Sequence, residues 1–171
     1  MTPNFKKIIP IFILVISFFL AHSSYAIEIA ITVDDLPAHG ELPPNTTRLE
    51  IEKIMLDTFK KHPIKNVYGF INGEKIKKDN EVLLQEWVRD GNFLGNHTFS
   101  HLDLAKVSAD QFIRDIKNNE NDLRKLMNKK NYKYFRYPYL SEGNTQEKRN
   151  QVRAFLFENH YQIAPVTVDF F

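Results

Sequence analysis

Short β-branched runs alternate with longer amphipathic segments along most of this 171-residue chain. The runs with the length and composition of strands are residues 27–33, 66–71, 93–95, 132–136 and 162–168. The segments that repeat apolar residues every three or four positions, as helices do, are residues 46–61, 80–90, 108–129 and 146–159. This alternation predicts a mainly parallel sheet covered by helices, either an α/β barrel or a doubly wound sheet.

The ends of the predicted helices are marked by capping and helix-breaking residues. Thr46 or Thr47 can cap the first helix, and Pro63 follows its end. Ser108 and Gln111 have the spacing of a capping box for the third helix. The side chains expected to face the core from the first two helices are Ile51, Ile54, Met55, Thr58, Phe59, Val82, Leu83, Trp87 and Val88.

The first 26 residues have the pattern of a secretory signal peptide. Lys6 and Lys7 precede an apolar run of 13 residues, 8–20. Ser24 and Ala26 place small side chains where a signal peptidase reads the chain. The run is shorter than the roughly 20 residues that cross a bilayer, which disfavours the alternative of an uncleaved membrane anchor. We therefore expect an exported protein, periplasmic or secreted, whose mature chain is one domain of residues 27–171.

Composition narrows the partners of the mature chain. The signal peptide carries two of the 23 basic residues and none of the 21 acidic ones, so the mature domain is neutral. A neutral domain gives no electrostatic reason to expect nucleic acid or an anionic membrane as a partner. Because the chain has no cysteine, an exported form must be stable without disulfides. The oligomeric state is left open by the sequence.

Polar residues capable of chemistry follow three of the predicted strands. Asp34 and Asp35 come after the first strand, His97 after the third, and Arg136 at the end of the fourth. In an α/β barrel, the carboxyl ends of the strands form the face that carries the active site. We therefore expect these side chains to meet at one end of the sheet.

The histidines His97 and His101 are the strongest candidates for a metal site. Imidazoles four residues apart on one face of a helical turn can share a metal ion, and neutral imidazole suits zinc and other first-row metals. One carboxylate of the pair Asp34 and Asp35 can complete the site, while the other acts as general base towards water. Taken separately, the same residues are also consistent with surface histidines and helix-capping acids.

Arg136 and Tyr139 flank Pro138 after the predicted fourth strand. An arginine at a strand end can hold a carboxylate in place through paired hydrogen bonds. A turn containing proline can present a backbone N–H to an oxyanion. Alone, this segment is equally consistent with a surface arginine beside packing aromatics.

Taken together and in this order, three segments resemble the motifs of the polysaccharide deacetylase family, carbohydrate esterase family four. Residues 32–36 match part of the family's T-F-D-D-G motif. Residues 97–101 match H-[ST]-x-x-H in full, and residues 136–139 match R-x-P-[FY]. The likeness extends from about residue 29 to residue 168, nearly all of the mature chain.

The resemblance implies a distorted (β/α) barrel, of which this chain carries a C-terminally incomplete part with about five strands and four helices. The residues that would hold a metal ion, usually zinc, are Asp35, His97 and His101. Asp34 would be the catalytic base, Arg136 would orient it, and the backbone N–H of Tyr139 would help to bind an oxyanion. The implied reaction is hydrolysis of N-acetyl groups on an amino-sugar polymer of the chitin or peptidoglycan type, which releases acetate.

Departures from the family pattern bear on the expected activity. Leu36 replaces the glycine after the acid pair, and its Cβ would restrict the turn and narrow the pocket near the metal. Asp169 could begin the family's fourth motif, but the tryptophan of that motif and the fifth motif, with its proton-donating histidine, are missing. Loss of general acid catalysis costs roughly 10²–10⁴-fold in rate, so we expect weak activity. The alternatives are a non-catalytic remnant that binds metal or glycan, and an esterase acting on O-acetyl groups of xylan.

Overall fold

The structure, a computed structural model, describes residues 28–37, 40–128 and 130–169. The predicted signal peptide, residues 1–26, lies outside the described residues. Residues 28–30 belong to a separate unit and are exposed without regular secondary structure. The fold described below is the unit that begins at Ile31. In the described part of the chain, no helix combines the length and the apolar character needed to cross a bilayer.

Five parallel strands form one sheet in the order of the sequence. They are β1 (Thr32–Leu36), β2 (Tyr68–Ile71), β3 (Phe93–Asn96), β4 (Tyr134–Phe135) and β5 (Gln162–Ile163). A doubly wound sheet reverses its strand order at a switch point, whereas a barrel adds each strand beside the previous one. The unbroken order therefore selects the barrel, and the predicted partial (β/α) barrel is confirmed.

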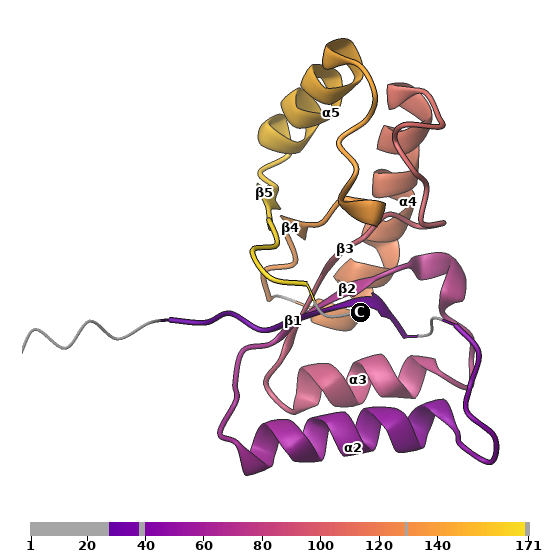
Figure 1. The fold of residues 1–171 in the computed structure, drawn as a ribbon, viewed down its shortest axis with the longest axis vertical. Coiled ribbons are helices and arrows are strands. Elements are labelled where there is room, and N and C mark those ends of the chain that lie inside the picture. Colours follow the sequence, from indigo (N-terminus) through magenta and orange to yellow (C-terminus); the bar gives the residue numbers. More distant parts are fainter. Residues whose placement is uncertain (1–27, 38–39, 129, 170–171) are drawn as a thin grey trace, which may run out of the picture. The chain divides into compact units, whose positions relative to one another are not determined.

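The helices follow the strands one by one around the sheet (Figure 1). They are α2 (Arg48–Lys61), α3 (Glu81–Arg89), α4 (Ala109–Met127) and α5 (Gln146–Glu158), with 3₁₀ turns at η2 (Gly73–Lys75) and η3 (Pro138–Leu140). Thr47, Ser108 and Thr145 cap α2, α4 and α5, each accepting a hydrogen bond from a backbone N–H three residues on. At α2 the carboxylate of Glu50 also accepts a hydrogen bond from the backbone N–H of Thr47, which completes a capping box.

All five predicted strands have somewhat different bounds in the structure, and the first and the last differ most. The first was expected over residues 27–33, but β1 begins at Thr32 and includes both acids; Ile29 before it is 82% exposed. The last was expected to reach residue 168, but β5 has only two residues. Both sequence predictions fail because pairing sets the length of a strand. Thr32 is the first residue of β1 with a partner in β2, and β5 can follow β4 only over the two residues that β4 offers.

The predicted inner face of α2 is partly wrong. Ile51 and Ile54 are exposed, whereas Glu52 and Leu56 are buried. The reason is that α2 packs against α3 (Figure 1). Glu52 therefore lies near Glu86 and Asp90, and Leu56 joins the cluster that holds Trp87, whereas Ile51 and Ile54 stay on the outer side of the helix. On α3, Trp87 and Leu83 are buried as predicted, but Val82 is exposed.

Helix α4 joins the two hydrophobic clusters of the core. One cluster gathers buried side chains from α4, α5, β4 and the loops beside them: Leu104, Ala109, Phe112, Ile116, Phe135, Tyr137, Val152, Phe155, Leu156 and Tyr161. The other gathers them from α2, α3, α4, β2 and β3: Leu56, Val67, Ile71, Leu84, Trp87, Leu94, Leu123 and Met127. Because the first half of α4 serves one cluster and its second half the other, this helix determines how the two halves of the sheet are held together.

Glu52 is a buried acid that lies near two other acidic residues, Glu86 and Asp90. Its side chain is only 7% exposed, and burial, followed by the nearby charges of Glu86 and Asp90 on α3, raises its pKa from 4.5 to about 7. An acid whose pKa is raised on folding binds its proton more tightly in the folded state. Its ionisation therefore destabilises the fold increasingly as the pH rises from about 4.5 to 7.

We predict that Glu52→Gln stabilises the protein at pH 8 by on the order of 2 kcal/mol, because the amide matches the neutral form of the acid. Most of this gain should be lost at pH 4.5, where Glu52 is protonated in the folded state and about half protonated in the unfolded state. Urea denaturation at the two pH values measures it. Asp57→Asn, at an exposed position of the same helix, is the control and should change the stability little at either pH. An equal gain at both pH values would contradict the prediction.

Candidate metal centre and active site

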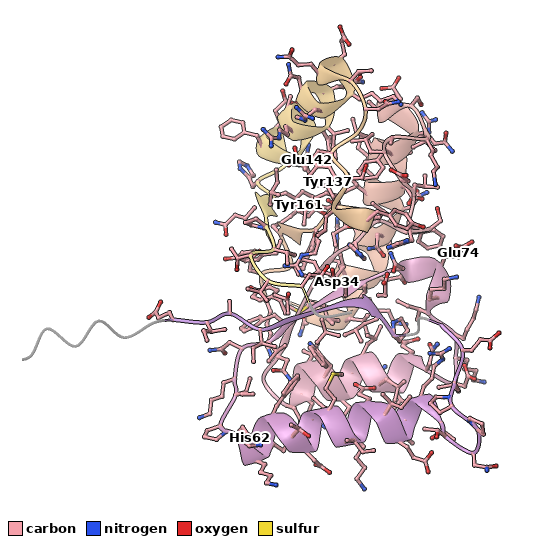
Figure 2. All side chains as sticks on the ribbon, in the orientation of Figure 1. Asp34, His62, Glu74, Tyr137, Glu142 and Tyr161 are labelled. Atoms are coloured by element: carbon pink, nitrogen blue, oxygen red, sulfur yellow. The ribbon has the colours of Figure 1, made fainter. Side chains whose placement is uncertain are left out.

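A cavity of about 790 Å³ lies at the carboxyl ends of the strands. Every site residue predicted from the sequence lines it: Asp34, Asp35, His97, His101, Arg136 and Tyr139. The other lining residues are Thr32, Val33, Tyr137, Leu140, Val166, Val168 and Asp169. Figure 2 shows Asp34 in the strand region, between α5 at the top of the view and α2 and α3 at the bottom. The structure thus brings together predicted site residues that are up to 105 positions apart in the chain, from Asp34 to Tyr139.

An extra residue in β1 directs both acids to this cavity. Val33 pairs with Gly69 and Leu36 with Ile71, so β1 spends one residue more than β2 over the same stretch, which is a β-bulge. Asp35 lies inside the bulge with a φ of 62°, a left-handed conformation that aspartate adopts more readily than most residues. Neighbouring residues of a regular strand point to opposite faces. A regular strand would therefore send one of the two acids away from the cavity, and the bulge prevents this.

The segment from His97 to His101 is an irregular turn, and the helical turn expected from the sequence is wrong. Thr98 and His101 have positive φ angles, 63° and 55°. These two left-handed residues bend the backbone so sharply that the rings of His97 and His101 still meet, with their centroids 5.0 Å apart. The two histidines, four residues apart, are therefore brought together by an irregular turn and not by a helix.

Asp35, His97 and His101 offer ligand atoms that all lie within 4.8 Å of one another. The Oδ1 atom of Asp35 is 3.1 Å from Nε2 of His101 and 3.7 Å from Nε2 of His97. One carboxylate and two imidazoles form a common set of three protein ligands for a catalytic zinc ion. Three donors that converge on one point, at the wall of an open cavity, fit a divalent metal with a position left for water.

The environment of His97 keeps its ring in the form that binds metals. Its Nδ1 lies 2.9 Å from the backbone oxygen of Arg136, so a proton on Nδ1 is donated there and Nε2 faces Asp35. Burial, above all, lowers the pKa of His97 to about 4. Near neutral pH the imidazole is therefore uncharged, as metal coordination requires.

Asp34 is held by a buried arginine. Arg136, 4% exposed, donates from Nη1 to Asp34 Oδ1 at 2.8 Å and to Thr32 Oγ1 at 2.6 Å. Its Nε donates to the backbone oxygen of Ala164 at 3.2 Å, and its guanidinium lies 4.4 Å from the ring centroid of Phe70. These contacts leave the arginine one orientation, so the carboxylate of Asp34 is fixed beside the ligand group.

The balance of burial and charge makes Asp34 a better base than an exposed aspartate. Burial is the largest influence and raises its pKa, the guanidinium of Arg136 opposes that rise, and the charge of Asp169 adds to it. The net result is a raised pKa. A carboxylate with a raised pKa accepts a proton more readily, while the hydrogen bond to Arg136 keeps it in position.

Tyr139 lies at the wall of the cavity, whereas Leu36 packs in the hydrophobic core. Tyr139 has a φ of 57°, and its ring packs edge-on at 4.6 Å from that of His101 at the cavity wall. Leu36 was expected to narrow the pocket, but it lies outside the cavity lining and packs in the core, where a Cβ at Gly69 would collide with it. The leucine therefore replaces the family glycine without closing the site.

Sequence reasoning missed Thr32 and the apolar side of the cavity. Thr32 lies two residues before Asp34 in β1, and alternation along a strand could have placed both on one face towards Arg136. Val166 and Val168 line the cavity from the segment after β5, which was expected to be strand. No local pattern marks them as site residues, since their position depends on how the chain leaves β5.

Comparison with known proteins places this geometry in a family. The polysaccharide deacetylase family model matches residues 24–158. A peptidoglycan-N-acetylglucosamine deacetylase of Bacillus cereus is 32% identical over 142 residues, covering 83% of this chain and 45% of the relative. A chitin deacetylase of Arthroderma benhamiae is 27% identical over 122 residues, covering 70% of this chain and 30% of the relative. The chain thus spans less than half the length of these curated relatives.

Solved structures show the same likeness in three dimensions. The Bc1960 peptidoglycan N-acetylglucosamine deacetylase superposes with a TM-score of 0.61 at 29% identity, over 80% of this chain and 55% of that one. A family 4 acetyl xylan esterase from Clostridium thermocellum, in complex with a cobalt ion, gives a TM-score of 0.52 at 25% identity, over 70% of this chain and 53% of that one. The matching family model, the barrel order of the strands and the convergent Asp-His-His group agree, and the chain belongs to the polysaccharide deacetylase family.

Proposed function

We propose that this protein hydrolyses N-acetyl groups on an amino-sugar polymer or oligomer of the chitin or peptidoglycan type, with release of acetate. The observation that carries the proposal is the placement of Asp34, fixed by Arg136, beside a group of three metal-binding side chains at one open cavity. A base next to a metal site is the arrangement that metal-assisted hydrolysis requires. Similarity to a peptidoglycan deacetylase and to a chitin deacetylase supports the class of substrate.

In this proposal each site residue has a distinct role in the reaction. Asp35, His97 and His101 would hold a divalent metal ion, which when bound supplies Lewis acidity to the acetyl carbonyl and to a water molecule. Asp34 accepts the proton of the attacking water, and Arg136 keeps its carboxylate aimed at that position. The backbone N–H of Tyr139, at the cavity wall, is proposed to donate to the oxyanion.

Zinc is the proposed ion, since a carboxylate and two neutral imidazoles suit it.

Export is part of the same proposal, because cell-wall glycans lie outside the cytoplasm and the first 26 residues have the pattern of a signal peptide. Mass spectrometry of the exported protein tests it: the mature chain should begin at Ile27, and an uncleaved N-terminus would count against export by this route.

Hydrolysis of O-acetyl groups is the second candidate function. It is favoured by the similarity to an acetyl xylan esterase and, at 27% identity, to a bifunctional xylanase/deacetylase of Pseudobutyrivibrio xylanivorans. The same metal group and base would serve either reaction, since both attack an acetyl carbonyl. The two candidates therefore differ in substrate and share the site.

We predict that the full chain, supplied with Zn²⁺, releases acetate from N-acetylglucosamine oligomers, and that a chelator stops the release until Zn²⁺ is restored. The reason is the dependence of the reaction on the ion held by the three ligands. Enzymatic determination of acetate measures it, with acetylated xylan as the parallel substrate. Faster release from xylan would favour the esterase, and full zinc loading without acetate from either substrate would favour a protein that only binds.

We predict opposite outcomes for the two neighbouring acids. Asp35→Asn should weaken Zn²⁺ binding by more than the roughly 10- to 100-fold that loss of an outer-shell partner costs, because it removes a ligand. Asp34→Asn should bind Zn²⁺ within a few-fold of the unmodified protein yet lose about 10²–10⁴-fold in turnover, because it removes the base. Calorimetric Zn²⁺ titration and acetate release measure the two effects. Loss of metal binding in Asp34→Asn, with binding retained in Asp35→Asn, would reverse the assigned roles.

A further inference from the structure

The turn that carries the two histidines is held in place from α4. Within it, Thr98 and His101 adopt left-handed backbone conformations that side chains other than glycine rarely take. Such conformations persist only where the surroundings impose them. Two side chains of α4, Asp115 and Asn119, supply contacts of this kind, and neither belongs to the ligand group.

Asp115 holds the second half of the turn. Its Oδ2 accepts from the backbone N–H of Ser100 at 2.9 Å, and its Oδ1 accepts from the Ser100 hydroxyl at 2.8 Å. Its backbone oxygen accepts from the N–H of Phe99 at 3.1 Å. With a residue exposure of 7%, Asp115 makes these bonds largely out of water, where they orient strongly. Ser100 is the residue directly before His101, so the position of its backbone sets the position of the His101 backbone.

Asn119 holds the first half of the turn, one helical turn further along α4. Its Nδ2 donates to Asn96 Oδ1 at 3.0 Å and to the backbone oxygen of Ile71 at 2.7 Å, while its Oδ1 accepts from the N–H of Gly73 at 2.8 Å. Asn96 is the residue directly before His97, and its Oδ1 also accepts from the N–H of Thr98 at 2.9 Å. Asn119 and Asn96 are both fully buried. One amide thus ties the ends of β2 and β3 together at the residue that precedes the first ligand.

We propose that Asp115 and Asn119 are positioning residues for the metal centre, an inference that rests on the metal site of the proposed function. They act by fixing the backbone on either side of Thr98 and Phe99, so that both Nε2 atoms face Asp35. Without Asp115, Ser100 loses two hydrogen bonds, and the left-handed His101 can relax away from the ligand group. Without Asn119, Asn96 loses a donor, the N–H of Gly73 loses its acceptor, and the Ile71 oxygen keeps only the N–H of His97.

Cobalt binding to the full chain tests this inference, with Co²⁺ itself as the probe. The affinity is measured by competition with a chelator, and the visible absorption of bound Co²⁺ reports the ligand geometry. The variants are Asp115→Ala, Asn119→Ala and the conservative Asp115→Asn, whose amide can accept from the N–H of Ser100 and donate to its hydroxyl. Asn118→Ala is the matched control, since Asn118 is the exposed neighbour of Asn119 on the same helix.

We expect Asp115→Ala and Asn119→Ala each to weaken Co²⁺ binding on the order of 10- to 100-fold and to alter the visible spectrum. Asp115→Asn should restore both, and Asn118→Ala should change neither. Far-ultraviolet circular dichroism confirms that each variant is folded under the conditions of the titration. A side chain that contributed only to stability would leave the affinity of a fully folded variant unchanged.

Unchanged affinity and spectrum in both folded alanine variants would overturn the inference. If Asp115→Ala does not fold, Ser100→Ala takes its place, because it removes only the bond between Ser100 Oγ and Asp115. A weaker Co²⁺ affinity of Ser100→Ala then supports the proposal, and an unchanged affinity overturns it. If Asn119→Ala does not fold, Asn119→Asp, which keeps the acceptor for Gly73 and loses both donors, is judged in the same way. Failure of the unmodified protein to bind Co²⁺ would instead count against the metal site itself.

Discussion

The bulge in β1 is the constraint on which the site depends. In a regular strand Asp34 and Asp35 would face opposite sides of the sheet, and only one of them could reach the cavity. The extra residue and the left-handed Asp35 turn both carboxylates towards it. A left-handed residue other than glycine costs roughly 1–2 kcal/mol. The contacts that Arg136 makes to Thr32 and Asp34, immediately before the bulge, help to offset that cost.

The helices and the cavity are linked through α4. Its apolar face serves both hydrophobic clusters, and its polar residues Asp115 and Asn119 reach the histidine turn from the same helix. Packing of α4 therefore fixes the ligands as well as the core. His97 then continues the connection, because its Nδ1 meets the backbone oxygen of Arg136. The Asp-His-His group, Asp34 and the core form one contiguous set of contacts.

Much of the fold, and the gathering of the predicted site residues at one end of the sheet, could be predicted from the sequence, because both depend on local pattern. Apolar runs separated by amphipathic segments indicate a parallel α/β sheet, and polar residues directly after those runs, such as His97, lie where strands end. The geometry of the site could not be predicted in the same way. The bulge at Asp35 depends on the register with β2, and the turn after His97 depends on Asp115 and Asn119, whose contacts reach Ser100 and Asn96 from 15 and 23 residues away. The inner face of α2 was misjudged because helical periodicity does not reveal where the neighbouring helix α3 lies.

One ion is proposed to be shared by Asp35, His97 and His101, with Asp34 left beside it. Anomalous X-ray diffraction at the zinc absorption edge, from crystals grown with Zn²⁺, tests this most directly. We predict a single strong peak among Asp35 Oδ1 and the two Nε2 atoms, at about 2.0–2.2 Å from each, with the carboxylate of Asp34 on Arg136 and outside the coordination sphere. A peak bound by Asp34, or no peak among these three side chains at saturating zinc, would contradict it.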